Sequence, residues 1–201
     1  MNKRALPKDV HEDSRCRLPM AKREELDEAG KKVFDHHLDP AGGSIAGLHG
    51  PGGIKLHSPR LAAATTPANR YLRRDAGFSG PIRELIILVA AREMDSRFEW
   101  AAHEPEALKE GLPQAIIDVV KHRKPTTGLP ETEATVITFG RQLFRDKRID
   151  PAVFAKALAI FGKRQLVDLV ALMGNYAGTA LLLAAFDMQL PDGDVKELPL
   201  G

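Results

Sequence analysis

Glu99 and His103 are the residues of this chain whose types and spacing best suit chemistry. They are four residues apart, so on a helix they share one face and bring a carboxylate beside an imidazole. A neighbouring carboxylate favours the protonated form of an imidazole, which can then donate a proton near neutral pH. Glu84 joins this pair if its own apolar segment folds back against them as an antiparallel hairpin. The three residues therefore predict a site for general acid and base catalysis.

Two helices are expected to position these groups. Pro81 suits the first turn of a helix, and apolar residues then recur at helical spacing until about residue 94. Asp95 or Ser96 can serve as the N-cap of a second helix, which carries the Glu-x-x-x-His pair. Pro105 lacks an N–H and its ring clashes one turn back, so this second helix is expected to kink just past the histidine.

Less specific roles remain open for each of these residues. Ser96 and Glu99 fit a capping box, in which the glutamate only bonds back to the N-cap N–H. A single histidine is more often structural than catalytic. Glu84 could instead form an ion pair with Arg83 or Arg92, as a glutamate on an apolar helix commonly does.

Residues 83–113 resemble the core of the carboxymuconolactone decarboxylase family, which also contains the alkylhydroperoxidase D-like proteins. In the redox branch of that family, a glutamate is followed by Cys-x-x-Cys and then by a histidine. Glu84 and His103 match the glutamate and the histidine, whereas Ser96 and Glu99 stand at the cysteine positions. The decarboxylase branch instead has Glu-x-x-x-His at this place, and the chain matches that pattern.

The resemblance extends from about residue 18 towards the C-terminal end of the chain. It includes LHSP at residues 56–59, EGLP at residues 110–113 and FGKRQLVDLVALMGNYAG at residues 161–178. It implies a cofactor-free carboxy-lyase that acts on a small carboxylated lactone or a related acid. It also implies a homo-oligomer, either a trimer or a hexamer, with sites at or near the contacts between subunits.

The resemblance further implies a role for each candidate residue. When CO2 leaves such a lactone, the electrons spread into the conjugated carbonyl, so the enzyme must hold a carboxylate, stabilise enolate charge and deliver a proton to carbon. We expect His103 to donate this proton, with Glu99 and Glu84 as its catalytic partners. The side chains expected to bind the substrate are His57, Tyr71, Arg92, Arg97 and Trp100.

Two other functions stay open. A non-catalytic or differently specific oligomeric paralogue would keep the fold without this activity. A thiol peroxidase of the alkylhydroperoxidase type is disfavoured because Ser96 and Glu99 cannot form a disulfide. No metal is expected either, since the adjacent His36 and His37 lack a second pair of ligands at a matching spacing.

The composition is typical of a soluble globular protein. The chain has 201 residues, of which 43% are hydrophobic and 28% are charged, which fits one domain with a sizeable core. Twenty-nine basic and 27 acidic residues leave a net charge of +2, so neither nucleic acid nor a membrane is expected as a partner. The single cysteine, Cys16, rules out a disulfide within the chain and fits a cytoplasmic location.

The predicted fold is an all-α helical bundle of seven or eight helices over residues 19–201. Residues 1–18 alternate charges of both signs and predict a flexible tail, whose cysteine has no assigned role. The glycine-rich residues 42–53 predict a loop, and residues 60–75 predict a helix that breaks or kinks near Pro67.

Residues 151–161 and 163–186 predict two further helices separated by Gly162. The last 18 residues of the second helix carry no charge, a length that could span a membrane. No aromatic or basic belts flank them, so we expect a helix at the centre of a bundle or at a subunit interface.

Overall fold

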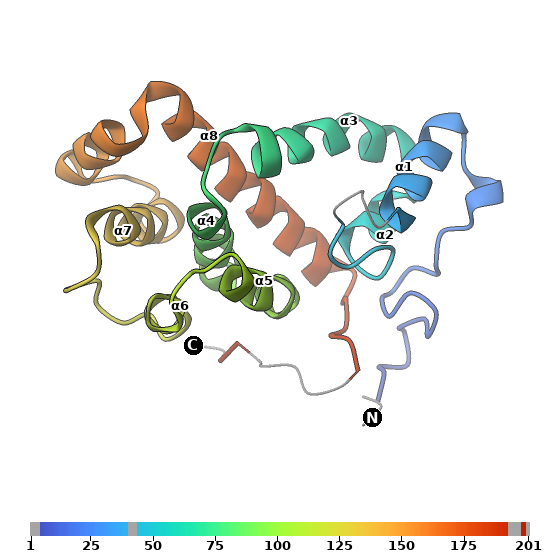
Figure 1. Cartoon of the computed structure of the whole chain (residues 1–201). Helices are drawn as coiled ribbons and strands as arrows, with labels where there is room; N and C mark the ends of the chain where they lie inside the picture. The colour runs from blue at the N-terminus through green and yellow to red at the C-terminus, as the bar shows by residue number, and fades with distance from the viewer. Residues whose placement is uncertain (1–4, 40–43, 193–197, 200–201) are drawn as a thin grey trace. The chain divides into compact units, whose positions relative to one another are not determined.

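The computed structural model describes residues 5–39, 44–192 and 198–199, and its regular elements are helices (Figure 1). The α-helices are α1 (Glu28–Leu38), α2 (Pro51–Lys55), α3 (Pro59–Arg70), α4 (Gly80–Glu93), α5 (Arg97–Lys109), α6 (Gln114–Lys121), α7 (Glu131–Arg145) and α8 (Pro151–Ala185). A short 3-10 helix, Arg23–Glu25, precedes α1, and a π-helix, Tyr71–Asp75, follows α3. No strand occurs among the described residues, so the predicted all-α class with seven or eight helices is confirmed.

The contacts within the chain divide it into two compact units. The described part of the first unit comprises residues 5–39, 44–70 and 181–192, and that of the second comprises residues 71–180 and 198–199. All three predicted catalytic residues belong to the second unit, whereas His57 belongs to the first.

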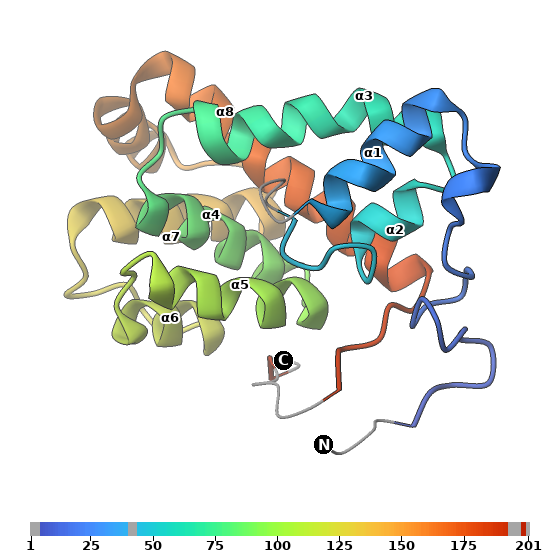
Figure 2. The same ribbon diagram turned by 45° about the vertical axis from the view of Figure 1, so that its right-hand side comes forward.

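Helix α4 lies at the centre of the second unit. Every residue from Glu84 to Arg92 is buried, because α5, α6 and α7 all pack against this helix. A helix that is apolar on all sides is what the centre of a helical unit requires. Figure 2 shows α4 and α5 lying side by side, joined by the short turn at residues 94–96. The predicted helical hairpin is therefore present.

Gly140 sets the distance between α7 and α4. A Cβ atom at this position would overlap Cγ1 of Val89 on α4 and would lie 2.9 Å from Cε of Met173 on α8. The absence of a side chain thus lets three helices meet around one point of the core.

Helix α8 consists of two helical segments that meet at Gly162. This glycine has φ 67° and ψ 174°, a conformation outside the helical region that glycine adopts without steric cost. The predicted separation of two helices at Gly162 is thus confirmed. Among the described residues, α8 alone is long and apolar enough to cross a membrane, and half of its most apolar stretch is buried within the protein.

The first unit differs from the sequence expectation at its N-terminal segment. The N–H of Arg17 donates to the carbonyl of Phe186 (2.8 Å), and the N–H of Gln189 donates to the carbonyl of Arg15 (2.9 Å). Cys16, which lies between Arg15 and Arg17 in the sequence, is buried. The alternating charges that suggested a flexible tail carry no information about such main-chain bonds, so the prediction did not anticipate this packing.

The glycine-rich segment contains helix α2, where the sequence predicted only a loop; residues 40–43 lie outside the described residues. Gly52 and Gly53 are both buried in α2. A Cβ atom at Gly52 would lie 2.6 Å from the ring of His37, and one at Gly53 would overlap the carbonyl oxygen of Leu48. These glycines therefore permit close packing.

Helix α3 does not end at Pro67, as the sequence allowed, but continues to Arg70 and then into the π-helix. Two threonine hydroxyls donate hydrogen bonds to main-chain carbonyl oxygens of the preceding turn. Thr65 donates to the carbonyl of Leu61 and Thr66 to that of Ala62, each at 2.8 Å. Such side-chain bonds are a known way to accommodate a locally disturbed helix.

Candidate active site

The structure brings the three predicted catalytic residues together. Nδ1 of His103 on α5 lies 2.7 Å from Oε2 of Glu84 on α4, and Nε2 of His103 lies 3.5 Å from Oε2 of Glu99. All three side chains are buried. The imidazole therefore lies between two carboxylates, one from each helix of the hairpin.

Glu84 is held as an anion by its neighbours. Burial alone would raise the pKa of this carboxyl group, but the hydrogen bonds and charges of His103 and Arg83 outweigh burial and hold the pKa below its ordinary value. Nε of Arg83 donates to Oε1 of Glu84 at 3.0 Å. Because an ionised carboxylate only accepts hydrogen bonds, Nδ1 of His103 must carry the hydrogen. Nε2 is then the nitrogen at which His103 can gain or lose a proton.

Ser96 and Glu99 do not form a complete capping box, because Ser96 is the N-cap of α5 but its side chain makes no capping bond. The N–H of Ser96 donates to the carbonyl of Ala91 at 2.8 Å, a main-chain bond of the tight turn. The carboxylate of Glu99 lies against His103.

Tyr176 on α8 is a neighbour of His103 that the sequence analysis did not single out. The two rings meet edge to face, with centroids 5.1 Å apart and planes at 86°. Burial strongly raises the pKa of Tyr176, and the nearby charges of Glu99 and Glu84 raise it further, against an opposing effect of Arg73. The phenol is therefore neutral and can donate a hydrogen bond. Its position within residues 161–178, where the sequence resemblance was noted, was an indication of importance, but it did not single out the tyrosine.

Two predicted substrate-binding residues on this hairpin lie away from His103. Arg92 follows Glu84 by eight residues on the same helix, a distance of about 12 Å along the axis, and it forms an ion pair with Asp95. Arg97 is the exposed first residue of α5, six residues or about 9 Å before the histidine.

Three further candidates are engaged in contacts of their own. Trp100 is fully buried, and its Nε1 donates to Oε2 of Glu104 at 3.1 Å. The hydroxyl of Tyr71 donates to Oδ2 of Asp168, also at 3.1 Å. His57 lies in the first unit, where its Nε2 is 2.9 Å from the carbonyl oxygen of Pro19.

The arrangement around His103 is suited to proton transfer. Within the part of the chain that the structure describes, no three His, Cys, Asp or Glu side chains are placed to hold a metal ion.

Comparisons with protein-family models, with curated proteins and with solved structures gave no match to this chain.

Proposed function

We propose that the protein is a cofactor-free carboxy-lyase of the carboxymuconolactone decarboxylase type, which acts in the cytoplasm on a small carboxylated lactone or a related acid. The observation that carries this proposal is the imidazole of His103 between the carboxylates of Glu84 and Glu99. The Glu-x-x-x-His pattern of the sequence supports the decarboxylase branch over the redox branch.

In this reaction, the bond between carbon and the departing carboxylate breaks, and its electron pair moves into the conjugated lactone carbonyl as an enolate. Nε2 of protonated His103 then donates its proton to carbon, which forms the new C–H bond. Glu84 fixes the ring orientation through the hydrogen on Nδ1, as the aspartate of a catalytic triad does. Glu99 stabilises the charged imidazole before transfer, and the neutral hydroxyl of Tyr176 is available to the enolate oxygen.

The proposal predicts that the purified protein releases CO2 from γ-carboxymuconolactone or a related lactone acid, and that Glu99→Gln lowers kcat by about 100-fold or more. The amide keeps the size of the side chain but cannot stabilise the imidazolium. Release of CO2 is measured directly, with Glu106→Gln as the control, since Glu106 is on the same helix but pairs with Lys109. If no lactone acid yields CO2, the protein is instead a non-catalytic or differently specific paralogue.

We also propose that the protein is a homo-oligomer, a trimer or hexamer, assembled through α8. Val167, Val170, Gly174 and Gly178 are exposed at helical spacing on this helix, and Val167 retains 68% of its accessible surface. A Cβ atom added at either glycine would meet nothing within 4 Å, so this apolar face is open to another helix.

Val170→Glu is therefore expected to shift the protein towards monomer, because the new charge would be buried in the interface. Light scattering at micromolar concentration measures the change in mass. Lys163→Glu, at an exposed position on the same helix, is the matched control and should leave the mass unchanged. A wild-type protein that is already monomeric would contradict the proposal.

A further inference from the structure

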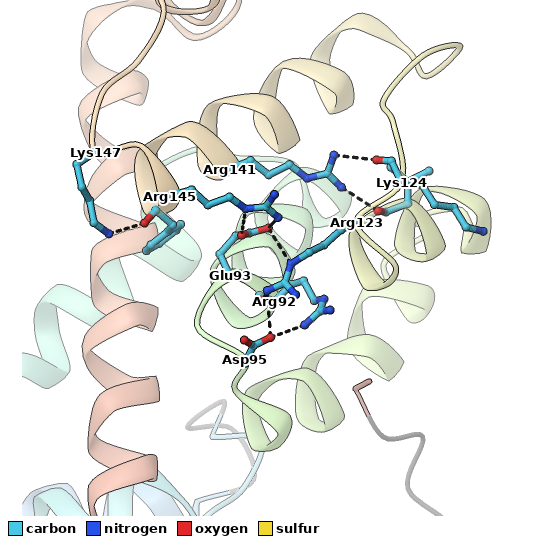
Figure 3. Close-up of polar contacts among 10 residues, drawn as sticks. Arg92, Glu93, Asp95, Arg123, Lys124, Arg141, Arg145 and Lys147 are labelled. Atoms are coloured by element: carbon cyan, nitrogen blue, oxygen red, sulfur yellow. Dashed lines mark hydrogen bonds and ion pairs between the residues drawn. The ribbon is translucent and has the colours of Figure 1, made fainter. Parts of the chain in front are cut away.

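Four arginine side chains gather where α4, α6 and α7 meet in the second unit (Figure 3). This arginine cluster consists of Arg92, Arg123, Arg141 and Arg145. Arg92 is on the last turn of α4, Arg123 follows the C-terminal end of α6, and the other two are on α7. Segments that are far apart in the sequence therefore contribute to one group of guanidinium side chains.

Two carboxylates lie within the arginine cluster. Arg145 donates to both oxygens of Glu93, at 2.6 and 2.7 Å. Arg92 and Arg123 share Oδ1 of Asp95, which Nη2 of Arg123 approaches to 3.1 Å.

Arg141 donates instead to main-chain oxygens, at 2.8 Å to Lys124 and 2.9 Å to Val119. Its guanidinium thus caps the C-terminal end of α6, where the carbonyl oxygen of Val119 also accepts from the N–H of Lys124. Main-chain oxygens carry only partial charge, so this contact leaves most of the positive charge of Arg141 uncompensated.

Positive charge therefore exceeds negative charge in the arginine cluster. Four guanidinium groups stand against the two carboxylates that contact them and a third, Asp146, whose charge also acts on Arg145. The C-terminal ends of α4 and α6 offset part of this excess, each with about half a negative charge, while the N-terminal end of α5 adds about half a positive charge. Burial lowers the pKa of Arg92, and the neighbouring charge of Arg123 lowers it further.

Hydrogen-bond donors are also in excess. The Nε atoms of Arg92 and Arg123 are buried and make no hydrogen bond, although that of Arg123 lies 3.9 Å from Oε1 of Glu93. The side chain of Arg92 is only 4% exposed. The N-terminal end of α5 begins directly after Asp95 and Ser96, and its N-cap side chain makes no capping bond. An anion would supply acceptors that these donors lack.

We propose that the arginine cluster binds a small phosphate-type oxyanion. An excess of positive charge favours an anion, and guanidinium forks are suited to paired hydrogen bonds with the oxygens of phosphate. The side chains of Asp95 and Arg145, 40% and 45% exposed, give the cluster a side open to solvent. Arg92 lies about two turns of α4 from Glu84, so this site is separate from the proposed proton-transfer site.

Calorimetric titration of the full-length protein with inorganic phosphate tests the proposal, with sodium chloride used to match the ionic strength of each solution. We expect saturable binding and a rise in Tm with phosphate that chloride does not produce. Methyl phosphate is titrated in parallel: equal or tighter binding points to a phosphorylated metabolite, whereas binding of inorganic phosphate alone points to the free ion. If neither compound binds beyond the chloride control, the proposal is wrong.

Two substitutions are expected to change phosphate affinity in opposite directions. Arg123→Gln removes one charged donor and should weaken binding by about tenfold or more. Asp95→Asn removes the competing carboxylate and should tighten binding; asparagine also tolerates the positive φ of 48° at this position. If the arginine cluster had only a structural role, Asp95→Asn would not be expected to bind phosphate more tightly than wild type.

Arg60→Gln is the matched control, because it changes net charge by the same amount at an exposed position on α3 in the first unit. It should leave the phosphate affinity unchanged. Equal affinities in wild type and Arg123→Gln would overturn the proposal. If Arg123→Gln does not fold, the decision rests on Asp95→Asn, whose failure to bind more tightly would overturn it as well.

Discussion

His103→Ala is expected to have two effects: it should abolish proton transfer and destabilise the fold. Loss of the general acid should lower turnover by about 100-fold to 10,000-fold. The substitution also leaves the buried carboxylate of Glu84 without its partner at 2.7 Å, and breaking a buried pair in this way costs about 3 kcal/mol or more of unfolding free energy. Urea unfolding at pH 7 measures the second effect, with the exposed His11→Ala as the control.

The pH dependence of stability distinguishes the loss of the ion pair between His103 and Glu84 from a simple loss of packing. The pKa of Glu84 is lowered in the folded protein, so its stabilising contribution is fully present above the unfolded value of 4.5 and is lost as pH falls through the folded value. Without His103, only Arg83 still opposes the effect of burial on this pKa. We therefore expect wild type to lose more unfolding free energy than His103→Ala when the pH is lowered from 6 to 3. Parallel profiles for the two proteins would contradict the assignment.

Trp100→Ala is expected to lower the free energy of unfolding by about 3–5 kcal/mol, the cost of removing a fully buried aromatic side chain. Trp100 also donates to Glu104, and the ammonium group of Lys121 lies 5.7 Å from the centre of its ring. The alanine variant therefore loses a core side chain, a hydrogen bond and a cation–π contact together.

Trp100→Phe tests the same position more gently. Phenylalanine keeps an aromatic ring in the core but removes the N–H that Glu104 accepts, so we expect a smaller loss of about 1–3 kcal/mol. Chemical unfolding followed by circular dichroism measures both variants, because the substitution removes the only tryptophan of the chain. A loss below 1 kcal/mol in Trp100→Ala, combined with weaker substrate binding, would favour the substrate-binding role that the sequence suggested.

The helical hairpin could be predicted because its signals are local. An apolar run behind Pro81 and a capping residue at Ser96 define α4 and α5 without reference to the rest of the chain. Gly162 likewise divides α8 where the sequence indicated, since the required positive φ is a property of that one residue.

The finer geometry of the site depends on contacts between helices, which spacing along one helix cannot supply. The i, i+4 rule made Glu99 the first partner of His103, yet the shorter contact is with Glu84, 19 residues away. Ser96 and Glu99 fit the capping pattern, but the side chain of Ser96 makes no capping bond in the structure. Tyr176 escaped notice because nothing local marks which residue of an uncharged helix meets the histidine.

Gly52 and Gly53 limit which substitutions the glycine-rich segment can accept during evolution. Such segments are commonly treated as spacers, in which residues drift freely and insertions accumulate. Here even the smallest side chain would collide with His37 or with the main chain at Leu48. The ring of His37 can turn aside, but the main-chain oxygen of Leu48 cannot, so a side chain at Gly53 would require the backbone itself to move. We therefore expect related chains to retain Gly53 more strictly than Gly52.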